Sequence, residues 1–164
     1  MGLRMITGIV SADDYVEAYR LHRRSVASAM TWIMGGAILF GIALTIFGKS
    51  FLGVIIVFGG IGGLIGEKIH AGLYLPNRAR KHYSQFKGID TPITYRWDSG
   101  KLSVQSERGG GDRDWESIHK LKENDRLFLL YLTDVLFEII PKAWFISQEQ
   151  MSEFRRYVRK SEGV

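Results

Sequence analysis

The sequence predicts an α+β membrane protein in which a two-helix transmembrane hairpin carries a small antiparallel β-sheet domain closed by a C-terminal helix. Residues 25–48 and 51–66 contain no charged residue, and only Lys49 and Ser50 separate them. Beyond residue 88, apolar and polar residues alternate, which is typical of strands with one buried face. A mean hydropathy near zero hides this division, because it averages a strongly apolar segment with strongly polar ones.

Residues 1–24 predict an N-terminal strand and a cytoplasmic helix. Residues 3–10 are β-prone, and Ser11 then begins the sequence S-A-D-D, in which Asp14 stands at the partner position of a capping box. Apolar residues recur at helical spacing after this cap, so the helix is expected to run directly into the first span. The early charged residues argue against a cleavable signal peptide.

Residues 25–75 predict the hairpin, with spans at about 28–48 and 51–69. A helix crosses the bilayer core in about 20 residues, and the first apolar stretch exceeds this length. The second stretch, between Lys49 and Glu67, is shorter, and snorkelling lysines make a span feasible. A buried core helix is the alternative for the first stretch, and a re-entrant segment is the alternative for the second. The short link predicts two antiparallel neighbours.

Basic residues predict the orientation of the hairpin. They flank its two outer ends as Arg20, Arg23, Arg24, Lys68, Arg78, Arg80, Lys81 and Lys87, whereas the connecting link holds only Lys49. Cationic residues next to membrane spans remain on the cytoplasmic side. We therefore expect a multi-pass membrane protein with both termini in the cytoplasm.

Glycines in the second span predict close helix packing. Four of them form two GxxxG pairs: Gly59, Gly62, Gly63 and Gly66. Small residues let helix backbones approach closely in lipid. Packing within the hairpin is the favoured interpretation, and a homodimer face is the alternative.

Residues 76–88 predict a basic linker helix next to the membrane, kinked or restarted at Pro76. Arg78, Arg80 and Lys81 are candidate lipid-headgroup residues, because anionic headgroups attract each such cation by about 1 kcal/mol. A net charge of +5 and a pI of about 9.5 would also suit nucleic acid. No nucleic-acid fold signature accompanies the charge, so the bilayer is the expected partner and nucleic acid is not.

Residues 89–164 predict a meander of about five antiparallel strands followed by a helix. Turns are expected at Asp98–Gly100, at Glu123–Asp125 and at Thr133–Asp134, and residues 109–111 are interpreted as a glycine loop. Ser147 and Gln150 form a second capping box at the start of the closing helix. Whether the strand at residues 3–10 joins this sheet is left open.

Several segments together resemble the YcxB-like bacterial membrane proteins over nearly the whole chain. They are SADDYVEAYRLH at residues 11–22, Trp115 with Ile118, IPKAWF at residues 140–145, and Gln148–Gln150 with Phe154 and Arg155. The resemblance implies a C-terminal domain similar to pleckstrin-homology (PH) domains, a strongly bent antiparallel sheet that usually has seven strands and is closed at one end by a helix. The family is largely of unassigned function, so the resemblance implies no catalytic residue.

No enzyme, cofactor or metal site is expected. The chain has no cysteine, and its histidines, His22, His70, His82 and His119, do not stand at metal-ligand spacing. Three carboxylates, Asp112, Asp114 and Glu116, would share one strand face, where an exposed charged edge is favoured over a cation site. Glu138 stands inside an apolar strand and is expected to face water or to pair with a lysine.

Together with the resemblance, which implies a bacterial inner-membrane location, these features predict an integral membrane protein that presents a cytoplasmic β-rich domain for protein or lipid-headgroup binding. The partners expected are a bilayer with anionic headgroups and either a protein partner or a second copy of the chain. The alternative function is an accessory subunit of a membrane transport or envelope-assembly complex, which the glycine-lined second span would suit.

Overall fold

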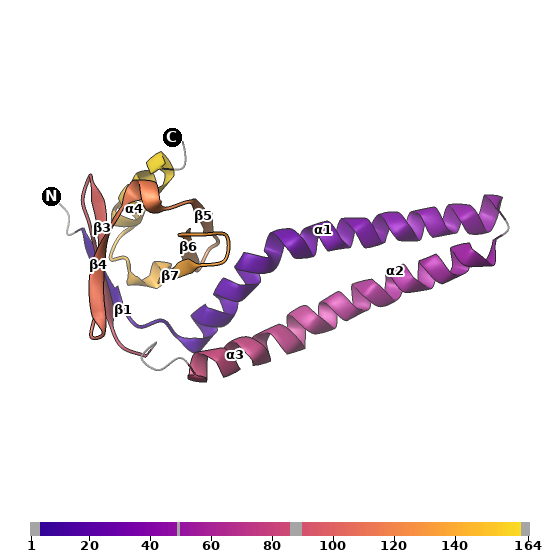
Figure 1. The fold of residues 1–164 in the computed structure, drawn as a ribbon, viewed down its shortest axis with the longest axis horizontal. Helices are drawn as coiled ribbons and strands as arrows, with labels where there is room; N and C mark the ends of the chain where they lie inside the picture. Colours follow the sequence, from indigo (N-terminus) through magenta and orange to yellow (C-terminus); the bar gives the residue numbers. More distant parts are fainter. Residues whose placement is uncertain (1–3, 49, 86–89, 162–164) are drawn as a thin grey trace. The chain divides into compact units, whose positions relative to one another are not determined.

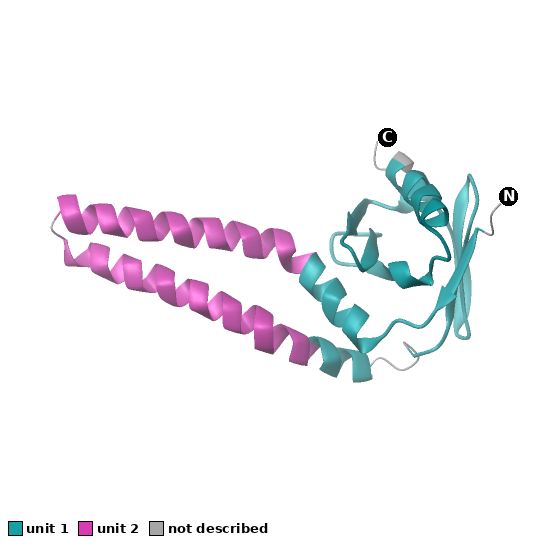
Figure 2. Ribbon diagram, turned by 180° about the vertical axis from the view of Figure 1, so that it is seen from behind, with its two compact units in different colours: residues 1–21, 79–164 teal, residues 22–78 magenta. Residues whose placement is uncertain are grey.

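The computed structural model describes residues 4–48, 50–85 and 90–161. The chain is α+β and divides into two compact units, residues 22–78 and residues 1–21 with 79–164 (Figure 2). The first unit consists of two long apolar helices, and the second contains two small antiparallel sheets and a closing helix (Figure 1).

The first helix, α1, begins at the predicted capping box and runs without interruption from Ala12 to Phe47. The backbone N–H and the hydroxyl of Ser11 donate to Asp14 Oδ2 at 3.1 and 2.6 Å, and the Asp14 N–H donates to Ser11 Oγ at 3.1 Å. These bonds satisfy donors that a helix N-terminus leaves without a backbone partner. The predicted continuity of the N-terminal helix with the first apolar stretch is confirmed.

The second helix, α2, covers Phe51–Ile69 and is capped by Ser50, whose hydroxyl accepts from the Leu52 N–H at 3.3 Å. By length and composition, α1 and the helical stretch from Phe51 to Gln85 could each cross a membrane. Only 6% and 11% of their most apolar windows are buried within the structure. The large side chains in these two windows therefore do not form a protein core.

A π-helical turn, His70–Tyr74, separates α2 from α3, which covers Leu75–Gln85. The Leu75 N–H donates to the His70 carbonyl, five residues back. Pro76 follows at once and has no N–H to donate, so the interruption of the α-helical bonding lies where proline would break it. This agrees with the predicted restart of the helix at Pro76; residues 86–88 of the predicted linker helix lie outside the described residues.

The two apolar helices approach most closely at glycines. A Cβ built on Gly41 would lie 2.8 Å from the Gly53 carbonyl oxygen, one on Gly60 would lie 2.6 Å from Ile38, and one on Gly63 would lie 2.7 Å from Met34. At Gly41 the near atoms include the facing backbone, so a larger residue there would push the two helices apart, whereas at Gly63 the flexible end of the Met34 side chain could move aside.

The other three candidate packing glycines, Gly59, Gly62 and Gly66, would have no atom within 4 Å of an added Cβ. Of the four glycines predicted from the GxxxG pairs, the structure therefore brings Gly63 against α1 and leaves three facing open space.

The four-stranded sheet contains β1 (Met5–Gly8), β2 (Ile93–Trp97), β3 (Lys101–Ser106) and β4 (Gly109–Asp114), antiparallel and in that order. β1 pairs with β2 from Met5↔Arg96 to Gly8↔Ile93, so the N-terminal strand does join the sheet. The predicted glycine loop at residues 109–111 is instead the first half of β4. Backbone pairing with β3 does not require side chains, and Gly110 packs directly against the Val104 carbonyl.

The three-stranded sheet contains β5 (Lys120–Glu123), β6 (Leu127–Tyr131) and β7 (Phe137–Pro141), also antiparallel. Six strands therefore follow the helices, where five were predicted, and β1 brings the total to seven. A 3₁₀ turn, Trp115–Ser117, connects the sheets, a second one, Lys142–Trp144, follows β7, and the last helix, α4, covers Gln148–Ser161.

Both faces of the three-stranded sheet are covered, and every residue of β6 is buried. One face, with Phe128 and Leu130, packs in a cluster with Trp97, Trp115 and Phe154. The opposite face, with Leu127, Leu129 and Tyr131, packs in a cluster with Val10, Ala18 and Leu21. The start of α1 thus belongs to the core of this unit, and the domain predicted at residues 89–164 has to be extended to include residues 1–21.

The closing helix is tied to the first strand through its cap. The Gln150 N–H donates to Ser147 Oγ at 3.2 Å, as the predicted capping box requires. The Gln150 side chain accepts from the Ile146 N–H at 3.0 Å and donates to the Met5 carbonyl at 3.1 Å. Gln150 is the one buried polar residue among those described, so its amide has a structural task.

We predict that Gly8→Ala destabilises the sheet domain by about 1–3 kcal/mol, because the new methyl group would overlap the Trp144 indole ring. Thermal unfolding of the detergent-solubilised chain, followed by the near-ultraviolet circular dichroism of tryptophan, measures this change. Gly111→Ala is the control, because nothing lies within 4 Å of its added methyl group, and it should change stability by less than about 0.5 kcal/mol. Equal effects of the two substitutions would contradict the packing described for Gly8.

Candidate functional site

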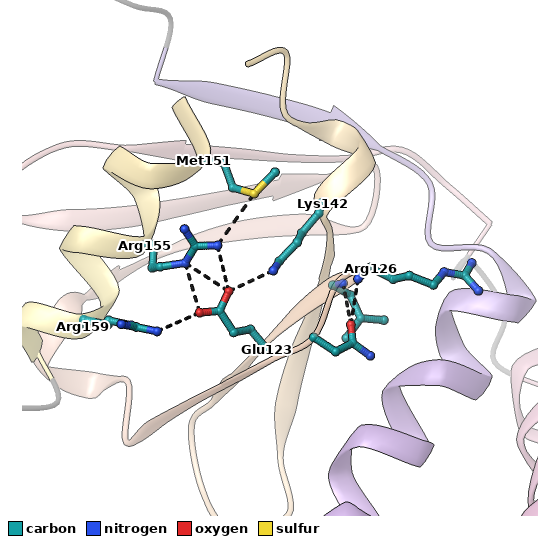
Figure 3. A network of polar contacts seen from close by, with 8 residues as sticks. Glu123, Arg126, Lys142, Met151, Arg155 and Arg159 are labelled. Atoms are coloured by element: carbon teal, nitrogen blue, oxygen red, sulfur yellow. Dashed lines mark hydrogen bonds and ion pairs between the residues drawn. The ribbon is translucent and has the colours of Figure 1, made fainter. Parts of the chain in front are cut away.

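Three basic side chains surround Glu123 in the sheet domain (Figure 3). We call Glu123, Lys142, Arg155 and Arg159 the Glu123 cluster. Glu123 ends β5, and Lys142 begins the 3₁₀ turn after β7. Arg155 and Arg159 lie one turn apart on α4, so both reach the same carboxylate.

Three cations converge on this one carboxylate. The Nε atom of Arg155 lies 3.0 Å from Oε1 and 3.1 Å from Oε2, and its Nη2 donates to Oε2 at 2.9 Å. Lys142 Nζ donates to Oε2 at 2.9 Å, and Arg159 Nη2 donates to Oε1 at 2.9 Å. The arrangement joins β5, the end of β7 and α4 through a single acidic group.

The electrostatics of Glu123 reflect these partners. Burial raises the pKa of its carboxyl group, but the hydrogen bonds from Arg155 and Lys142 and their positive charges outweigh burial, so that the pKa lies below its ordinary value. The side chain of Glu123 is 21% exposed, that of Lys142 14% and that of Arg159 61%. Glu123 and Lys142 are therefore mostly buried, whereas Arg159 extends into solvent.

Two of the cations, Lys142 and Arg155, also lie over the aromatic ring of Phe128. Lys142 Nζ lies 4.6 Å from the centroid of the Phe128 ring, and the Arg155 guanidinium carbon lies 5.4 Å from it. Phe128 is fully buried in the core. Cation–π attraction to a fixed ring holds both cations in place independently of Glu123.

Sequence reasoning did not find this cluster, because Glu123 was interpreted as part of a turn. Lys142, Arg155 and Arg159 are separated from it by 19, 32 and 36 residues, so no local spacing links them. The only available signal was the excess of cations on the last turns of the closing helix.

The candidate lipid-headgroup residues, Arg78, Arg80 and Lys81, all lie on α3 and are exposed. Arg80 Nη2 pairs with Asp13 Oδ1 at 3.1 Å, where both side chains are more than half exposed. An exposed pair of this kind leaves most of the charge available to solvent or to headgroups.

The three carboxylates predicted to share a strand face do not do so. Asp112 and Asp114 belong to β4, whereas Glu116 lies in the 3₁₀ turn that follows, where the strand alternation has ended. Asp112 is paired with Lys101 and accepts from Ser103 Oγ at 2.6 Å. Among the described residues, no group of three histidine, aspartate or glutamate side chains is placed to hold a metal ion.

Glu138 corrects another expectation, because it neither faces water nor pairs with a lysine. Its side chain is 15% exposed, and its Oε1 lies 2.7 Å from Arg113 Nη2. Leu130 of β6 pairs with Glu138 of β7 and belongs to the core cluster that also contains Trp97. Glu138 therefore lies on the face of the sheet that points toward this cluster. Burial raises the pKa of Glu138, and Arg113 opposes the shift only in part.

Two of the histidines have polar partners that the structure describes. Arg23 Nη1 donates to His70 Nδ1 at 2.7 Å within the helical unit. His119 Nε2 lies 3.4 Å from the exposed carboxylate of Asp134. Neither pair includes a nucleophile or a second base, so the geometry around these rings supports no catalytic role.

We predict that Glu123→Gln destabilises the sheet domain by about 2 kcal/mol at neutral pH, because it leaves three cations around a neutral amide. Since the folded pKa of Glu123 lies below the ordinary 4.5, its stabilisation is present above pH 4.5 and is lost as the pH falls through the folded pKa. Unfolding of both chains as a function of pH measures the effect. The exposed pair of Asp112 with Lys101 provides a control, and Asp112→Asn should change the stability much less than Glu123→Gln does. A difference between Glu123→Gln and the parent chain that stays constant into acid would contradict this account.

The comparisons with known proteins give one match, and it lies within the sheet domain. Residues 97–158 match the family model described as YcxB-like protein. This range begins at the end of β2 and stops within α4, so it includes the whole Glu123 cluster except Arg159 and excludes α1 to α3. No curated protein and no solved structure matches the chain. The expected resemblance is confirmed over this range: residues 97–158 of the chain are similar to the YcxB-like family.

Proposed function

We propose that this protein is a membrane-anchored binding module, without catalytic activity, whose two apolar helices span the bacterial inner membrane and hold the sheet domain at its cytoplasmic surface. There the domain and the basic helix α3 bind anionic lipid headgroups. The observation that carries the proposal is the exposure of the apolar side chains of α1 and α2.

These side chains are large and many. Among the most exposed are Trp32 at 80%, Leu39 at 70%, Phe47 at 86%, Phe51 at 77% and Phe58 at 70%. Each such side chain gains about 1.5–3 kcal/mol when it leaves water for an apolar environment. A soluble protein would bury them in its own core, whereas a bilayer supplies that environment from outside.

The distribution of cations supports the orientation. Arg20, Arg23 and Arg24 precede the apolar part of α1, and Lys68, Arg78 and Arg80 follow that of α2. Retention of such residues in the cytoplasm would place the sheet domain and both chain ends inside the cell, and the link at Ser50 outside.

The topology of the domain supports a PH-like fold. Seven strands form one sheet of four and one of three, and a C-terminal helix packs into the cluster between them. This is the number of strands, and the closing helix, that the resemblance to the YcxB-like family implies. The proposed binding role of this domain rests on analogy with PH domains at the level of the fold.

The exposed glycines of α2 favour a second candidate function, that of an accessory subunit in a transport or envelope-assembly complex. No atom lies within 4 Å of a Cβ built on Gly59, Gly62 or Gly66, so these positions would admit another helix at close range. Loss of a crosslinked partner in Gly59→Leu, with the hairpin intact, would distinguish this role from headgroup binding.

Cysteine labelling tests the anchor and its orientation, because the native chain contains no cysteine. In intact cells whose outer membrane admits the reagent, a membrane-impermeant maleimide should label Ser50→Cys. It should label Ser152→Cys, on the exposed face of α4, only after the inner membrane is opened. Labelling of Ser152→Cys in intact cells would overturn the orientation, and recovery of the chain in the soluble fraction would overturn the anchor.

Headgroup binding is tested by an environment-sensitive dye on Asn77→Cys, an exposed position of α3. Its emission should shift to the blue in nanodiscs that contain phosphatidylglycerol relative to nanodiscs of phosphatidylcholine alone, and salt should reduce the shift. The double variant Arg80→Gln, Lys81→Gln should lose most of the difference. Arg108→Gln, which changes an exposed cation on the β3–β4 turn, should keep it. Equal emission in the two lipids would contradict headgroup binding.

A further inference from the structure

The Glu123 cluster holds more positive charge than its own acid can balance. In every other ion pair that the structure describes, one acidic group has one basic partner: Glu17–Arg20, Asp13–Arg80, Asp14–Arg126, Asp112–Lys101, Asp134–His119, Glu138–Arg113 and Glu153–Arg4. Glu123 alone has three, Lys142, Arg155 and Arg159. Three positive charges against one negative charge leave a local excess of about two.

The dipole of α4 accounts for only part of this excess. Arg155 and Arg159 lie in the second half of the helix, whose C-terminus carries roughly half a negative charge. After this contribution, about one and a half positive charges remain. A phosphate monoester carries about −1.5 to −2 at pH 7, so its charge is the right size to complete the cluster.

Donors remain for such a ligand. The five short contacts to Glu123 fill the lone-pair positions of its two oxygens, so the carboxylate cannot engage the cations further. Arg159 uses one of its five N–H groups in this network and is 61% exposed. Lys142 Nζ and Arg155 Nη1 each keep N–H groups that these bonds do not use.

The fold holds these donors in position before a ligand arrives. Lys142 and Arg155 both rest on the buried ring of Phe128, and Arg155 is fixed to Glu123 by three contacts. Groups that are already ordered lose little conformational entropy on binding. Guanidinium groups also match phosphate oxygens in a bidentate geometry.

We propose that the Glu123 cluster binds a phosphate monoester group, held by Arg159, Arg155 and Lys142, with Glu123 setting the net charge of the site. This site extends the proposed function, because a phosphate monoester is borne both by some lipids and by soluble metabolites. It is distinct from the cations of α3, and it requires no bilayer.

The test is titration of the full chain in an uncharged detergent with inorganic phosphate, with ionic strength held constant by sodium chloride. Thermal stabilisation and phosphorus-31 line broadening report binding. The parent chain should show saturable binding. Arg159→Gln should weaken it about tenfold, which corresponds to one charge-assisted contact, because this exposed side chain reaches the ligand without supporting the core.

Two further variants separate binding from stability. Arg156→Gln is the matched control, because Arg156 is an exposed cation on the same helix with no described bond to Glu123, and binding should stay within about twofold. Glu123→Gln should bind phosphate more tightly than the parent chain although its fold is less stable, because the competing negative charge is gone. If the network were purely structural, Glu123→Gln would lose stability and would bind phosphate no more tightly than the parent chain.

The source of the phosphate is distinguished by two probes in the same detergent, glycerol 3-phosphate and short-chain phosphatidic acid. Preference for the second, lost in Arg159→Gln, would assign the site to lipid, and equal binding would assign it to soluble phosphate esters. The proposal is overturned if neither probe nor inorganic phosphate binds, or if Arg159→Gln binds them as the parent chain does. That result would leave the cysteine-labelling and nanodisc outcomes unaffected, and their failure would leave this site standing.

Discussion

Hydrophobic packing of the N-terminal residues onto the three-stranded sheet is the contact on which the rest of the structure depends. Ala18 and Leu21 of α1, with Val10 before it, cover the face of β6 formed by Leu127 and Leu129. Without this cover, an entirely apolar strand would have one face in water. β1 adds a second connection by completing the four-stranded sheet, and Gln150 joins it to the closing helix. The domain is therefore built from both ends of the chain.

This construction explains how the apolar helices are held. In the order of the chain, α1, α2 and α3 are inserted between β1 and β2 of one domain. The chain therefore continues from each of the two helical arms of the hairpin into a strand of the domain. The capping box at Ser11 starts α1 inside the domain core, and the same helix continues into the apolar stretch. Folding of the domain and pairing of the two helices are therefore linked through continuous chain at two points.

Much of this architecture could be predicted from local sequence signals, because caps and long apolar stretches act within a few residues. The Ser11 and Ser147 caps and the two apolar helices are of this kind. β4 was missed, because Gly109–Gly111 has no side chains to alternate and backbone pairing with β3 leaves no pattern in the sequence. The expectation that Glu138 faces water or pairs with a lysine was wrong. Because both faces of β6 and β7 are covered, alternation of residues along these strands does not identify a side that faces solvent. The Glu123 cluster depends on residues brought together by three separate elements, which only the folded chain reveals.

The most direct measurement of the central claim compares residues 90–161 expressed alone with the same residues fused to residues 1–21 through a flexible linker. The account predicts that residues 90–161 alone give the poorly dispersed amide spectrum of an unfolded or molten chain, because β6 and β2 each lose a neighbour. The fusion should restore dispersed signals and a cooperative unfolding transition. A folded, cooperatively unfolding domain from residues 90–161 alone, with a stability equal to that of the fusion, would contradict the claim.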